Sequence, residues 1–461
     1  MPSQEMNLPN YFLADLPPEA TLSPAMLTEA CQTLKRNRER YLAGRSTEQL
    51  VRVLSDVAEA WRQPDNPFRK LALECGPAET GFSSATLKRG LDAFFRQITR
   101  DNLQALLVQD LGKDSSHVSR VTGHDSRHAS SATRQFWRGP EFLVHIAAGN
   151  IPNPTWMSII LGLLSRSAQF VKCATGSAFL PRLFAHSIYE ADPKLGACLE
   201  IAEWPGGNAD LENVLFAEAD CVTATGNDET LVAIRSQLPA HARFLGYGHR
   251  VSFGFVAKEV LSHSRALRIA VHVTDDVVAW NQLGCLSPHV IYVQTGGEVS
   301  PEKFAELLAE ELEQREQVEP RGELPTPPAA VITSRRGIYE VRAAHSPETL
   351  MWYSKESTAW TVVFEADPRF QVSCLNRFIY VKPVKDLTEL LQHAEVVRGE
   401  VSTVGLAAPE HHAEELAAAL ARWGVTRVCP LGQMQNPPLT WRHDGRPALG
   451  DLVTWTDFEI Q

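Results

Sequence analysis

The spacing of apolar residues along the chain changes near residue 140. Before that point apolar positions recur at helical intervals, and the capping-box pattern Ser46-Thr47-Glu48-Gln49 predicts a helix start. The apolar face that follows consists of Leu50, Val53, Leu54, Val57 and Trp61. We therefore expect a helical N-terminal region over residues 1–110, beginning with a proline-rich arm. The polar stretch from Asp101 to Arg134 favours a solvated loop over a metal site, although it contains His117, His124 and His128.

From Phe142 onward, short apolar runs alternate with helical patterns. The strand-like runs are Phe142–Ala148, Gln169–Ala174, Leu199–Trp204, Asp220–Ala224 and Val251–Ala257. Helical patterns lie between most of them, at Thr155–Leu164, Ser177–Glu190 and Glu229–Leu238. A second α/β unit begins near Val251, with further strands expected at Val331–Ser334 and Arg377–Val384 and a helix at His411–Trp423. Buried strands that alternate with helices predict doubly wound parallel sheets, which bind nucleotides at their carboxyl edge.

The 461-residue chain is too long for a single core, which indicates two domains. Its formal net charge is −11 and no dense run of Lys or Arg occurs, so we expect no nucleic-acid partner. The eight scattered cysteines indicate neither a disulfide framework nor a zinc site, and we expect no bound metal. The longest apolar run, Trp156 to Leu164, is too short to span a bilayer, and no signal-peptide pattern opens the chain. We therefore expect a cytoplasmic protein without a membrane span.

The stretch from Trp280 to Val293 contains the candidate nucleophile. Cys285 follows a glycine at a break before a β-branched strand, and Pro288 confirms the break because proline cannot continue a ladder. A cysteine on such a turn can present its sulfur to a cleft, whereas the commoner state of a free cysteine is a small buried hydrophobic side chain. His249 is a second candidate for catalysis. The sequence does not show that it meets Cys285, and a histidine beside an arginine is often merely exposed.

Asn150, Lys172 and the pair Thr225-Gly226 lie at the ends of predicted strands. Asn150, in the segment G-N-I-P, can offer its amide to a developing oxyanion, although a turn asparagine is the plain alternative. Lys172 ends a buried strand, so its ammonium must reach water or a phosphate. Thr225-Gly226 before a helix start leaves backbone N–H groups free for a diphosphate. Neither G-x-G-x-x-G nor a P-loop occurs, which disfavours an ordinary Rossmann or kinase site.

Together these segments resemble the aldehyde dehydrogenase superfamily. G-N-I-P is similar to its W-N-F-P oxyanion segment, F-V-K-C-A-T to its V-x-K-P-A-E cofactor strand and T-G-N-D-E to its F-T-G-S turn. L-G-Y-G-H-R occupies the place of its E-L-G-G-K, and Q-L-G-C resembles its G-Q-x-C nucleophile segment. Y-G-H-R-V-S-F, G-C-L-S-P-H and the terminal W-R-H-D-G-R narrow the resemblance to the LuxC-type acyl-CoA reductases. These are the reductase component of the fatty acid reductase complex in bacterial luminescence.

The resemblance implies an α/β fold of the aldehyde-dehydrogenase type, with two doubly wound α/β domains, a cleft between them and a helical N-terminal region. Residues 111–250, with a C-terminal return over 430–461, would form the NADP-binding domain, and residues 251–429 the catalytic domain. Cys285 would be the nucleophile and Asn150 an oxyanion donor. The implied cofactor-binding residues are Lys172, Thr175, Thr225, Gly226 and Gly248.

The reaction that the resemblance implies is reduction of a long-chain acyl thioester, such as acyl-CoA, to the fatty aldehyde. It would pass through an acyl-cysteine on Cys285 and use NADPH as hydride donor. The resemblance also implies a homo-oligomer and an acyl-protein synthetase or transferase subunit as a partner.

Two departures from the superfamily pattern bear on this chemistry. Gly246 occupies the position of the general-base glutamate, so this segment has no carboxylate to activate water against the acyl-enzyme, which suits a reductase. Thr175 occupies a position where NAD-preferring relatives carry Glu, and a carboxylate there would repel a 2′-phosphate, so Thr175 favours NADPH. The alternatives are an aldehyde-oxidising NAD(P) dehydrogenase of the same fold, a cofactor-independent acyltransferase or thioesterase, and a catalytically silent subunit.

Overall fold

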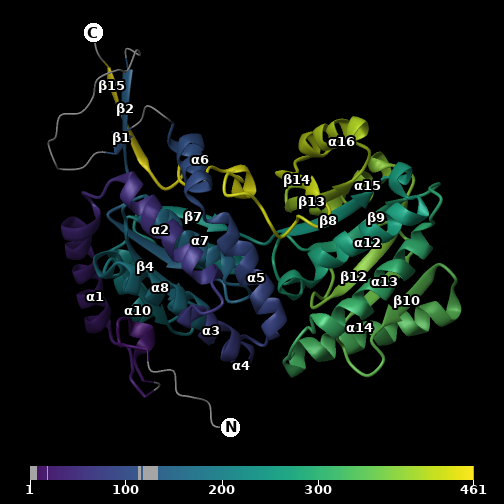
Figure 1. Ribbon diagram of the computed structural model, residues 1–461, viewed down its shortest axis with the longest axis horizontal. Coiled ribbons are helices and arrows are strands. Elements are labelled where there is room, and N and C mark those ends of the chain that lie inside the picture. Colours follow the sequence, from purple (N-terminus) through teal and green to yellow (C-terminus); the bar gives the residue numbers. More distant parts are fainter. Residues whose placement is uncertain (1–7, 18, 113–115, 118–132, 460–461) are drawn as a thin grey trace.

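The computed structural model describes residues 8–17, 19–112, 116–117 and 133–459. Two lobes, each built on a central sheet, lie side by side, and the C-terminal segment passes from the second lobe back to the first (Figure 1). Within the described ranges, no helix is both long and apolar enough to cross a membrane. In the same ranges, no group of three or more His, Cys, Asp or Glu side chains could hold a metal ion.

The first lobe contains a five-stranded parallel sheet in the order β5-β4-β3-β6-β7. Its strands are β3 (Phe142–Ile146), β4 (Ala168–Cys173), β5 (Leu199–Glu203), β6 (Cys221–Thr225) and β7 (Arg243–Tyr247). Its helices are α7 (Asn153–Leu164), α8 (Phe179–Ala191), α9 (Pro193–Gly196), α10 (Ala209–Ala217) and α11 (Asp228–Gln237). From β3 the chain passes first to the β4 side and later to the β6 side. Such folds bind ligands at the carboxyl edge where the strand order reverses.

Helices of the N-terminal region cover both faces of this sheet. They are α1 (Pro24–Asn37), a π-helical turn (Arg38–Leu42), α2 (Thr47–Arg62), α3 (Pro67–Glu74), α4 (Gly76–Thr80), α5 (Ser84–Gln97) and α6 (Arg100–Leu111). The predicted capping box of Ser46 and Gln49 is confirmed, with both hydrogen bonds 3.2 Å long. The predicted apolar face of α2 is buried against α5, α7 and α8, whereas α1 packs with α10 and α11 on the opposite face.

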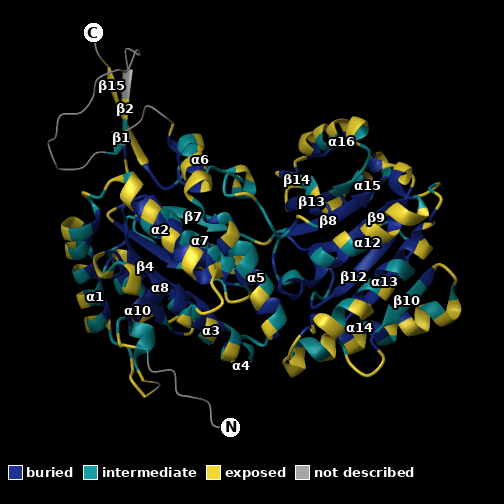
Figure 2. Cartoon of the chain, viewed as in Figure 1, coloured by how far each residue is buried: buried dark blue, intermediate teal, exposed yellow. Residues whose placement is uncertain are grey.

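The second lobe contains a seven-stranded sheet in the order β10-β11-β12-β9-β8-β13-β14, parallel except for the edge strand β10. Its strands are β8 (Val251–Val256), β9 (Pro288–Gln294), β10 (Thr349–Tyr353), β11 (Thr361–Glu365), β12 (Phe378–Val384), β13 (Val401–Ala407) and β14 (Arg427–Pro430). Its helices are α12 (His263–Val278), α13 (Pro301–Val318), α14 (Thr326–His345), α15 (Leu387–His393) and α16 (Glu410–Trp423). Helices α12 and α13 cover one face, and α14, α15 and α16 cover the other. Figure 2 shows the buried strands of both sheets inside exposed helices.

Two sequence-based expectations about secondary structure are wrong. The predicted strand Val331–Ser334 lies inside helix α14, because Ile332, Arg336 and Tyr339 are buried at helical spacing while Val331 is 51% exposed. The loop interpretation of Asp101–Arg134 is wrong as far as Leu111, where α6 continues the helical region expected over residues 1–110. Four leucines of this helix face the core: Leu103, Leu106, Leu107 and Leu111. His117 lies in the short strand β1 (Ser116–His117), and His124 and His128 lie outside the described residues.

The C-terminal segment crosses between the lobes before it ends in strand β15 (Thr454–Glu459). Strand β15 pairs antiparallel with β2 (Thr133–Arg138) in a three-stranded sheet that also holds β1. This small sheet projects from the first lobe, and β15 is exposed along its length (Figures 1 and 2). The residues between β14 and β15 therefore lie near the junction of the lobes.

Candidate active site

Cys285 lies on the turn that connects helix α12 to strand β9, residues 279–287, hereafter the nucleophile turn. A short 3-10 turn, Ala279–Gln282, leads into it and includes three consecutive left-handed residues. Trp280, Asn281 and Gln282 have φ angles of 50°, 51° and 65°. Side chains other than glycine rarely adopt this region, so the surrounding structure must hold the turn in place.

A second left-handed turn braces the first. Leu375, Asn376 and Arg377 have φ angles of 60°, 56° and 65°. The Arg377 guanidinium is buried and donates to Asn281 Oδ1 over 3.0 Å and to Glu316 Oε2 over 2.9 Å. The two turns thus hold each other, and the turn that carries Cys285 has one well-defined conformation.

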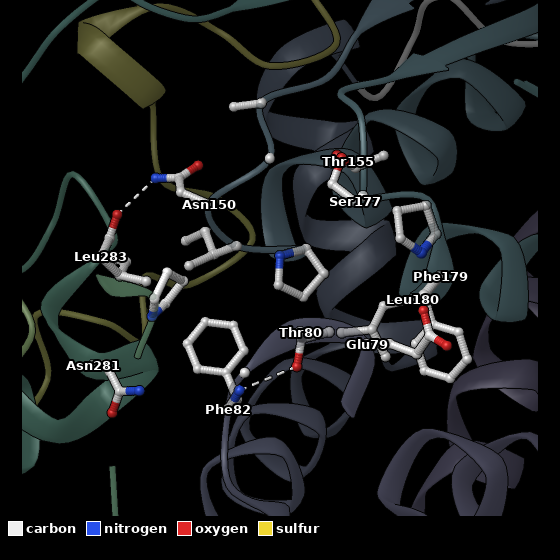
Figure 3. Close-up of a pocket in the computed structure, with 18 of the residues that line it drawn as sticks. Glu79, Thr80, Phe82, Asn150, Thr155, Ser177, Phe179, Leu180, Asn281 and Leu283 are labelled. Carbon is white, nitrogen blue, oxygen red and sulfur yellow. Dashed lines mark hydrogen bonds between the residues drawn. The ribbon is translucent and has the colours of Figure 1, made fainter. Parts of the chain in front are cut away.

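Asn150 joins the first lobe to the nucleophile turn. It follows strand β3, its side chain is exposed, and its Nδ2 donates to the carbonyl oxygen of Leu283 over 2.6 Å (Figure 3). This bond spans 133 positions of sequence and ends two residues before Cys285. The structure therefore brings the predicted oxyanion donor next to the turn of the predicted nucleophile.

The Cys285 thiol is half-buried. Burial and, to a smaller extent, the Asp444 carboxylate raise its pKa to about 11, against the opposing effects of the Cys285 and Leu286 backbone N–H groups and the Arg250 guanidinium. At neutral pH the resting side chain is thus a thiol, and attack on a substrate requires loss of its proton. The Cys285 carbonyl oxygen accepts a hydrogen bond from Ser252 Oγ at 2.8 Å, which ties the turn to strand β8.

The turn Trp441–Arg446, hereafter the C-terminal turn, closes over the end of strand β7. The ring of His443 stacks on Tyr247 with centroids 4.6 Å apart, and Arg446 Nη2 donates to the Gly246 carbonyl oxygen over 3.0 Å. Sequence inspection singled out W-R-H-D-G-R but assigned it no contact with the site, because no local pattern links residues so far apart in the chain.

The predicted cofactor residues gather at the carboxyl edge of the five-stranded sheet. Lys172 lies near the end of β4, 5% exposed, with its Nζ 5.7 Å from the centre of the Trp204 ring. Burial lowers the pKa of Lys172, and Glu212 and Glu203 oppose that effect. Thr175 is exposed in the loop that follows β4.

Thr225, Gly226 and Gly248 form the other half of this edge. Thr225 ends β6, and Gly226 N donates to the Tyr247 carbonyl oxygen over 3.2 Å. A Cβ on Gly248 would lie 2.4 Å from Asp228 Oδ1, so only glycine fits against the start of helix α11. A Cβ added to Gly176, Gly206 or Gly207 would meet no atom within 4 Å. The carboxyl edge is therefore open at these three glycines.

A cavity of about 330 Å³ opens beside Asn150 (Figure 3). The N-terminal helices, both lobes and the loop before α14 contribute walls. Its apolar wall residues include Phe82, Ile151, Phe179, Leu180, Leu283 and Leu324. Asn150 is a polar group among them, and Figure 3 shows its amide directed toward Leu283. The cavity thus offers an apolar space that ends at the predicted oxyanion donor.

A family model for acyl-CoA reductase (LuxC) matches residues 42–455. The chain belongs to this family. The resemblance to the LuxC-type branch of the aldehyde dehydrogenase superfamily is confirmed.

Curated relatives of this chain are named long-chain acyl-protein thioester reductases. The long-chain acyl-protein thioester reductase 2 of Photobacterium leiognathi is 23% identical over 321 residues, 68% of this chain and 63% of that protein. The long-chain acyl-protein thioester reductase of Vibrio harveyi is 24% identical over 68% of this chain and 64% of that protein. The chain thus spans less than two thirds of the length of these relatives. The long-chain acyl-protein thioester reductase of Photorhabdus luminescens is 23% identical over 89% of this chain and 82% of that protein.

Solved aldehyde dehydrogenases share the fold. The Delta-pyrroline-5-carboxylate dehydrogenase of Mycobacterium tuberculosis superposes with a TM-score of 0.68 at 13% identity, over 95% of this chain and 83% of that one. The NAD-dependent benzaldehyde dehydrogenase of Corynebacterium glutamicum superposes with a TM-score of 0.67 at 12% identity, over 95% of this chain and 91% of that one. The predicted α/β fold class is confirmed.

His249 does not join Cys285 in this member of the LuxC family. Its side chain is exposed, and its backbone N donates to Asp228 Oδ1 over 3.3 Å. Nearby His289 is buried, and burial, with a smaller contribution from His249, lowers its pKa to about 4. Among the described residues, no hydrogen bond links the His249 ring to the nucleophile turn. A catalytic role for His249 therefore has no geometric support here.

Glu203 is a residue of the cofactor edge that the sequence analysis missed. Its carboxylate accepts hydrogen bonds from Gly176 N at 2.8 Å and Ala178 N at 3.1 Å, so a negative charge lies beside Thr175. The signal was present, because an acid at the carboxyl end of a predicted strand faces the nucleotide edge.

Gly90 on helix α5 makes room for Trp280 of the nucleophile turn. A Cβ at this position would lie 2.1 Å from Trp280 Cζ2. We expect Gly90→Ala to destabilise the protein by roughly 1–3 kcal/mol through overpacking, and to slow modification of Cys285. Thermal unfolding and alkylation rates measure the two effects.

The matched control is Gly337→Ala on helix α14, where an added Cβ would meet nothing within 4 Å. This variant should be stabilised by roughly 0.5–1 kcal/mol, because alanine is the better helix former. Equal behaviour of the two variants would contradict the close contact between Gly90 and Trp280.

Proposed function

We propose that the protein is an NADPH-dependent acyl thioester reductase that converts a long-chain acyl-CoA to the fatty aldehyde through an acyl-enzyme on Cys285. The observation that carries the proposal is the hydrogen bond from Asn150 Nδ2 to the Leu283 carbonyl oxygen, two residues before Cys285. It brings the Asn150 amide of one lobe to the turn of the other lobe that carries Cys285. The names of the curated relatives, long-chain acyl-protein thioester reductases, support a long-chain acyl thioester as the substrate class.

In the first step, the Cys285 thiolate attacks the thioester carbonyl. The carbonyl oxygen becomes an oxyanion, which the Asn150 amide and the Cys285 backbone N–H stabilise. To do so, Asn150 exchanges its bond with Leu283 for one with the oxyanion. The C–S bond to CoA then breaks, and the proton lost by Cys285 balances the charge of the departing thiolate.

The residues Lys172, Thr175, Thr225, Gly226 and Gly248 would hold NADPH, which would supply the hydride that reduces the acyl carbon in the second step. The same two donors hold the resulting thiohemiacetal oxyanion, and its collapse expels the Cys285 thiolate and releases the aldehyde. Gly246 contributes no carboxylate to activate water, so hydrolysis of the acyl-enzyme lacks the base that an aldehyde-oxidising relative needs. This difference favours reduction over aldehyde oxidation.

The cavity beside Asn150 is proposed to receive the acyl chain. Its volume is about 330 Å³. A methylene group is taken to occupy the volume of one water molecule, about 30 Å³. On that basis the cavity holds on the order of ten methylenes. A longer chain would extend past the rim at Leu324. An acyl-protein synthetase or transferase partner and a homo-oligomer are proposed from family membership alone.

Cofactor choice should respond in opposite directions to two substitutions at the same edge. Thr175→Glu should weaken NADPH relative to NADH by about tenfold (~1.4 kcal/mol), because a carboxylate beside a 2′-phosphate is a like-charge contact. Glu203→Gln should strengthen NADPH relative to NADH by a similar factor, since it removes the charge. Its single amide oxygen can still accept one of the two bonds that Gly176 N and Ala178 N donate to the carboxylate. Fluorescence titration with both cofactors measures the ratio. An unchanged ratio in both variants would place recognition of the 2′-phosphate elsewhere.

The function is tested by intact-mass measurement after mixing the protein with acyl-CoAs of several chain lengths without NADPH. We expect one acyl adduct, and peptide mapping should locate it on Cys285. Addition of NADPH should then release aldehyde and restore the original mass. Release of the acyl group without cofactor binding would indicate a thioesterase or acyltransferase instead. Absence of any adduct would overturn the proposal.

A further inference from the structure

The C-terminal turn brings a buried carboxylate, Asp444, to the junction of the lobes. Its side chain is 9% exposed, and its Oδ1 lies 3.3 Å from Arg250 Nε and 3.9 Å from His443 Nε2. Its φ of 52° is left-handed, which is uncommon for a residue other than glycine. A carboxylate buried in this way depends on its cationic partner, because an unpaired buried charge is strongly destabilising.

Asp444 and Cys285 converge on the start of strand β8. Arg250, the partner of Asp444, immediately precedes β8, and Ser252 in β8 donates to the Cys285 carbonyl oxygen over 2.8 Å. The C-terminal turn is fastened there by the stacking of His443 on Tyr247. A second C-terminal residue, Gln435, donates through Nε2 to Ser287 Oγ on the nucleophile turn.

Two charged side chains act on the Cys285 sulfur, one from each of these segments. Burial is the main reason that the pKa of Cys285 is raised to about 11; within that value Asp444 contributes to the rise and Arg250 opposes it. His443 faces Asp444, and burial lowers the pKa of His443 while Asp444 opposes that effect. The anion thus favours the thiol and the cation favours the thiolate.

We propose that Asp444 and Arg250 form a charge pair that sets how readily Cys285 loses its proton, and hence how fast it attacks an acyl thioester. Both are positioning residues, and their effect on the sulfur is electrostatic. Burial keeps the resting sulfur protonated, and Asp444, whose influence is stronger than that of Arg250, reinforces this state. A protonated sulfur is protected from oxidation because the thiolate is the reactive form. The purpose of the pair rests on the nucleophilic role proposed for Cys285.

The test is the pH dependence of iodoacetamide alkylation at Cys285 in the full chain, followed peptide by peptide with mass spectrometry. Asp444→Asn should lower the midpoint by about one pH unit, and Arg250→Gln should raise it by a similar amount. At a pH below the midpoint, lowering the midpoint by one unit gives about tenfold more thiolate. The thiolate is then less basic, however, and therefore a weaker nucleophile. The net expectation at pH 8 is alkylation roughly threefold faster for Asp444→Asn and roughly threefold slower for Arg250→Gln.

Two variants serve as controls. Asp444→Glu retains the charge and should restore the wild-type midpoint, and it keeps the test decisive if Asp444→Asn folds poorly. Arg446→Gln also removes a charge from the C-terminal turn, but Arg446 is not among the charges that act on the Cys285 sulfur. The alkylation midpoint should therefore stay unchanged in this variant. The proposal would be overturned if the alkylation midpoint shifted in the same direction in Asp444→Asn and Arg250→Gln, or if it shifted in neither variant. The assay contains no acyl thioester, so its outcome is separate from the test of the proposed function.

Discussion

Replacement of Cys285 by alanine is expected to abolish both acyl labelling and aldehyde formation. Without the sulfur no acyl-enzyme forms, and removal of a covalent nucleophile costs on the order of 10⁶ in turnover in a well-studied serine protease. Binding of NADPH should stay intact, because the predicted cofactor residues lie on the other lobe. Intact-mass labelling with an acyl-CoA, aldehyde detection and cofactor titration together measure the three properties.

Cys374→Ala is the matched control for this substitution. Cys374 is also half-buried, and burial raises its pKa to about 11, as for Cys285. It lies next to the second left-handed turn but lacks the bond that joins Asn150 to the nucleophile turn. The control should therefore label and turn over like the wild type. An adduct that moves to Cys374, or persists in Cys285→Ala, would mean that Cys285 is not the nucleophile.

Asn150→Ala should lower turnover by roughly 10²–10³, which corresponds to about 3–4 kcal/mol of lost transition-state stabilisation. One of the two proposed oxyanion donors disappears, while the backbone N–H of Cys285 remains. The thermal midpoint should change little, because the Asn150 side chain is exposed and its hydrogen bond goes to a single carbonyl. Single-turnover measurement of acyl transfer isolates the step in which the oxyanion forms.

A control with the same local chemistry is Asn102→Ala. Asn102 is also exposed, and its Nδ2 donates to the Gln97 carbonyl oxygen over 2.8 Å, within the N-terminal helices. Loss of that bond should affect stability about as much as Asn150→Ala but leave turnover unchanged. If Asn150→Ala instead retains near-normal acyl transfer, Asn150 does not hold the oxyanion.

The order of the strands and helices was largely readable from the sequence, because local burial patterns reflect how each element packs. Alternation of apolar runs with helical patterns predicted four of the five strands of the first lobe, β3 to β6, and strand β8 of the second lobe, but it missed β7. The face from Leu50 to Trp61 predicted the buried side of α2. The prediction failed where local preference and tertiary burial disagree. Val331–Ser334 contains residues that favour strands, yet the burial of Ile332 and Tyr339 selects a helix.

The sequence by itself also determined which chemistry was available. It specifies that a cysteine stands at 285, an asparagine at 150 and a glycine at 246, but it does not specify what these residues contact. Only the tertiary structure decided which groups meet. It joins Asn150 to the nucleophile turn, leaves His249 exposed, and brings Asp444 from the C-terminal turn to Arg250. These contacts link segments far apart in the chain, and they depend on how two lobes pack and where the C-terminus returns. No periodicity within one element carries that information, because periodicity records only which face of the element is buried.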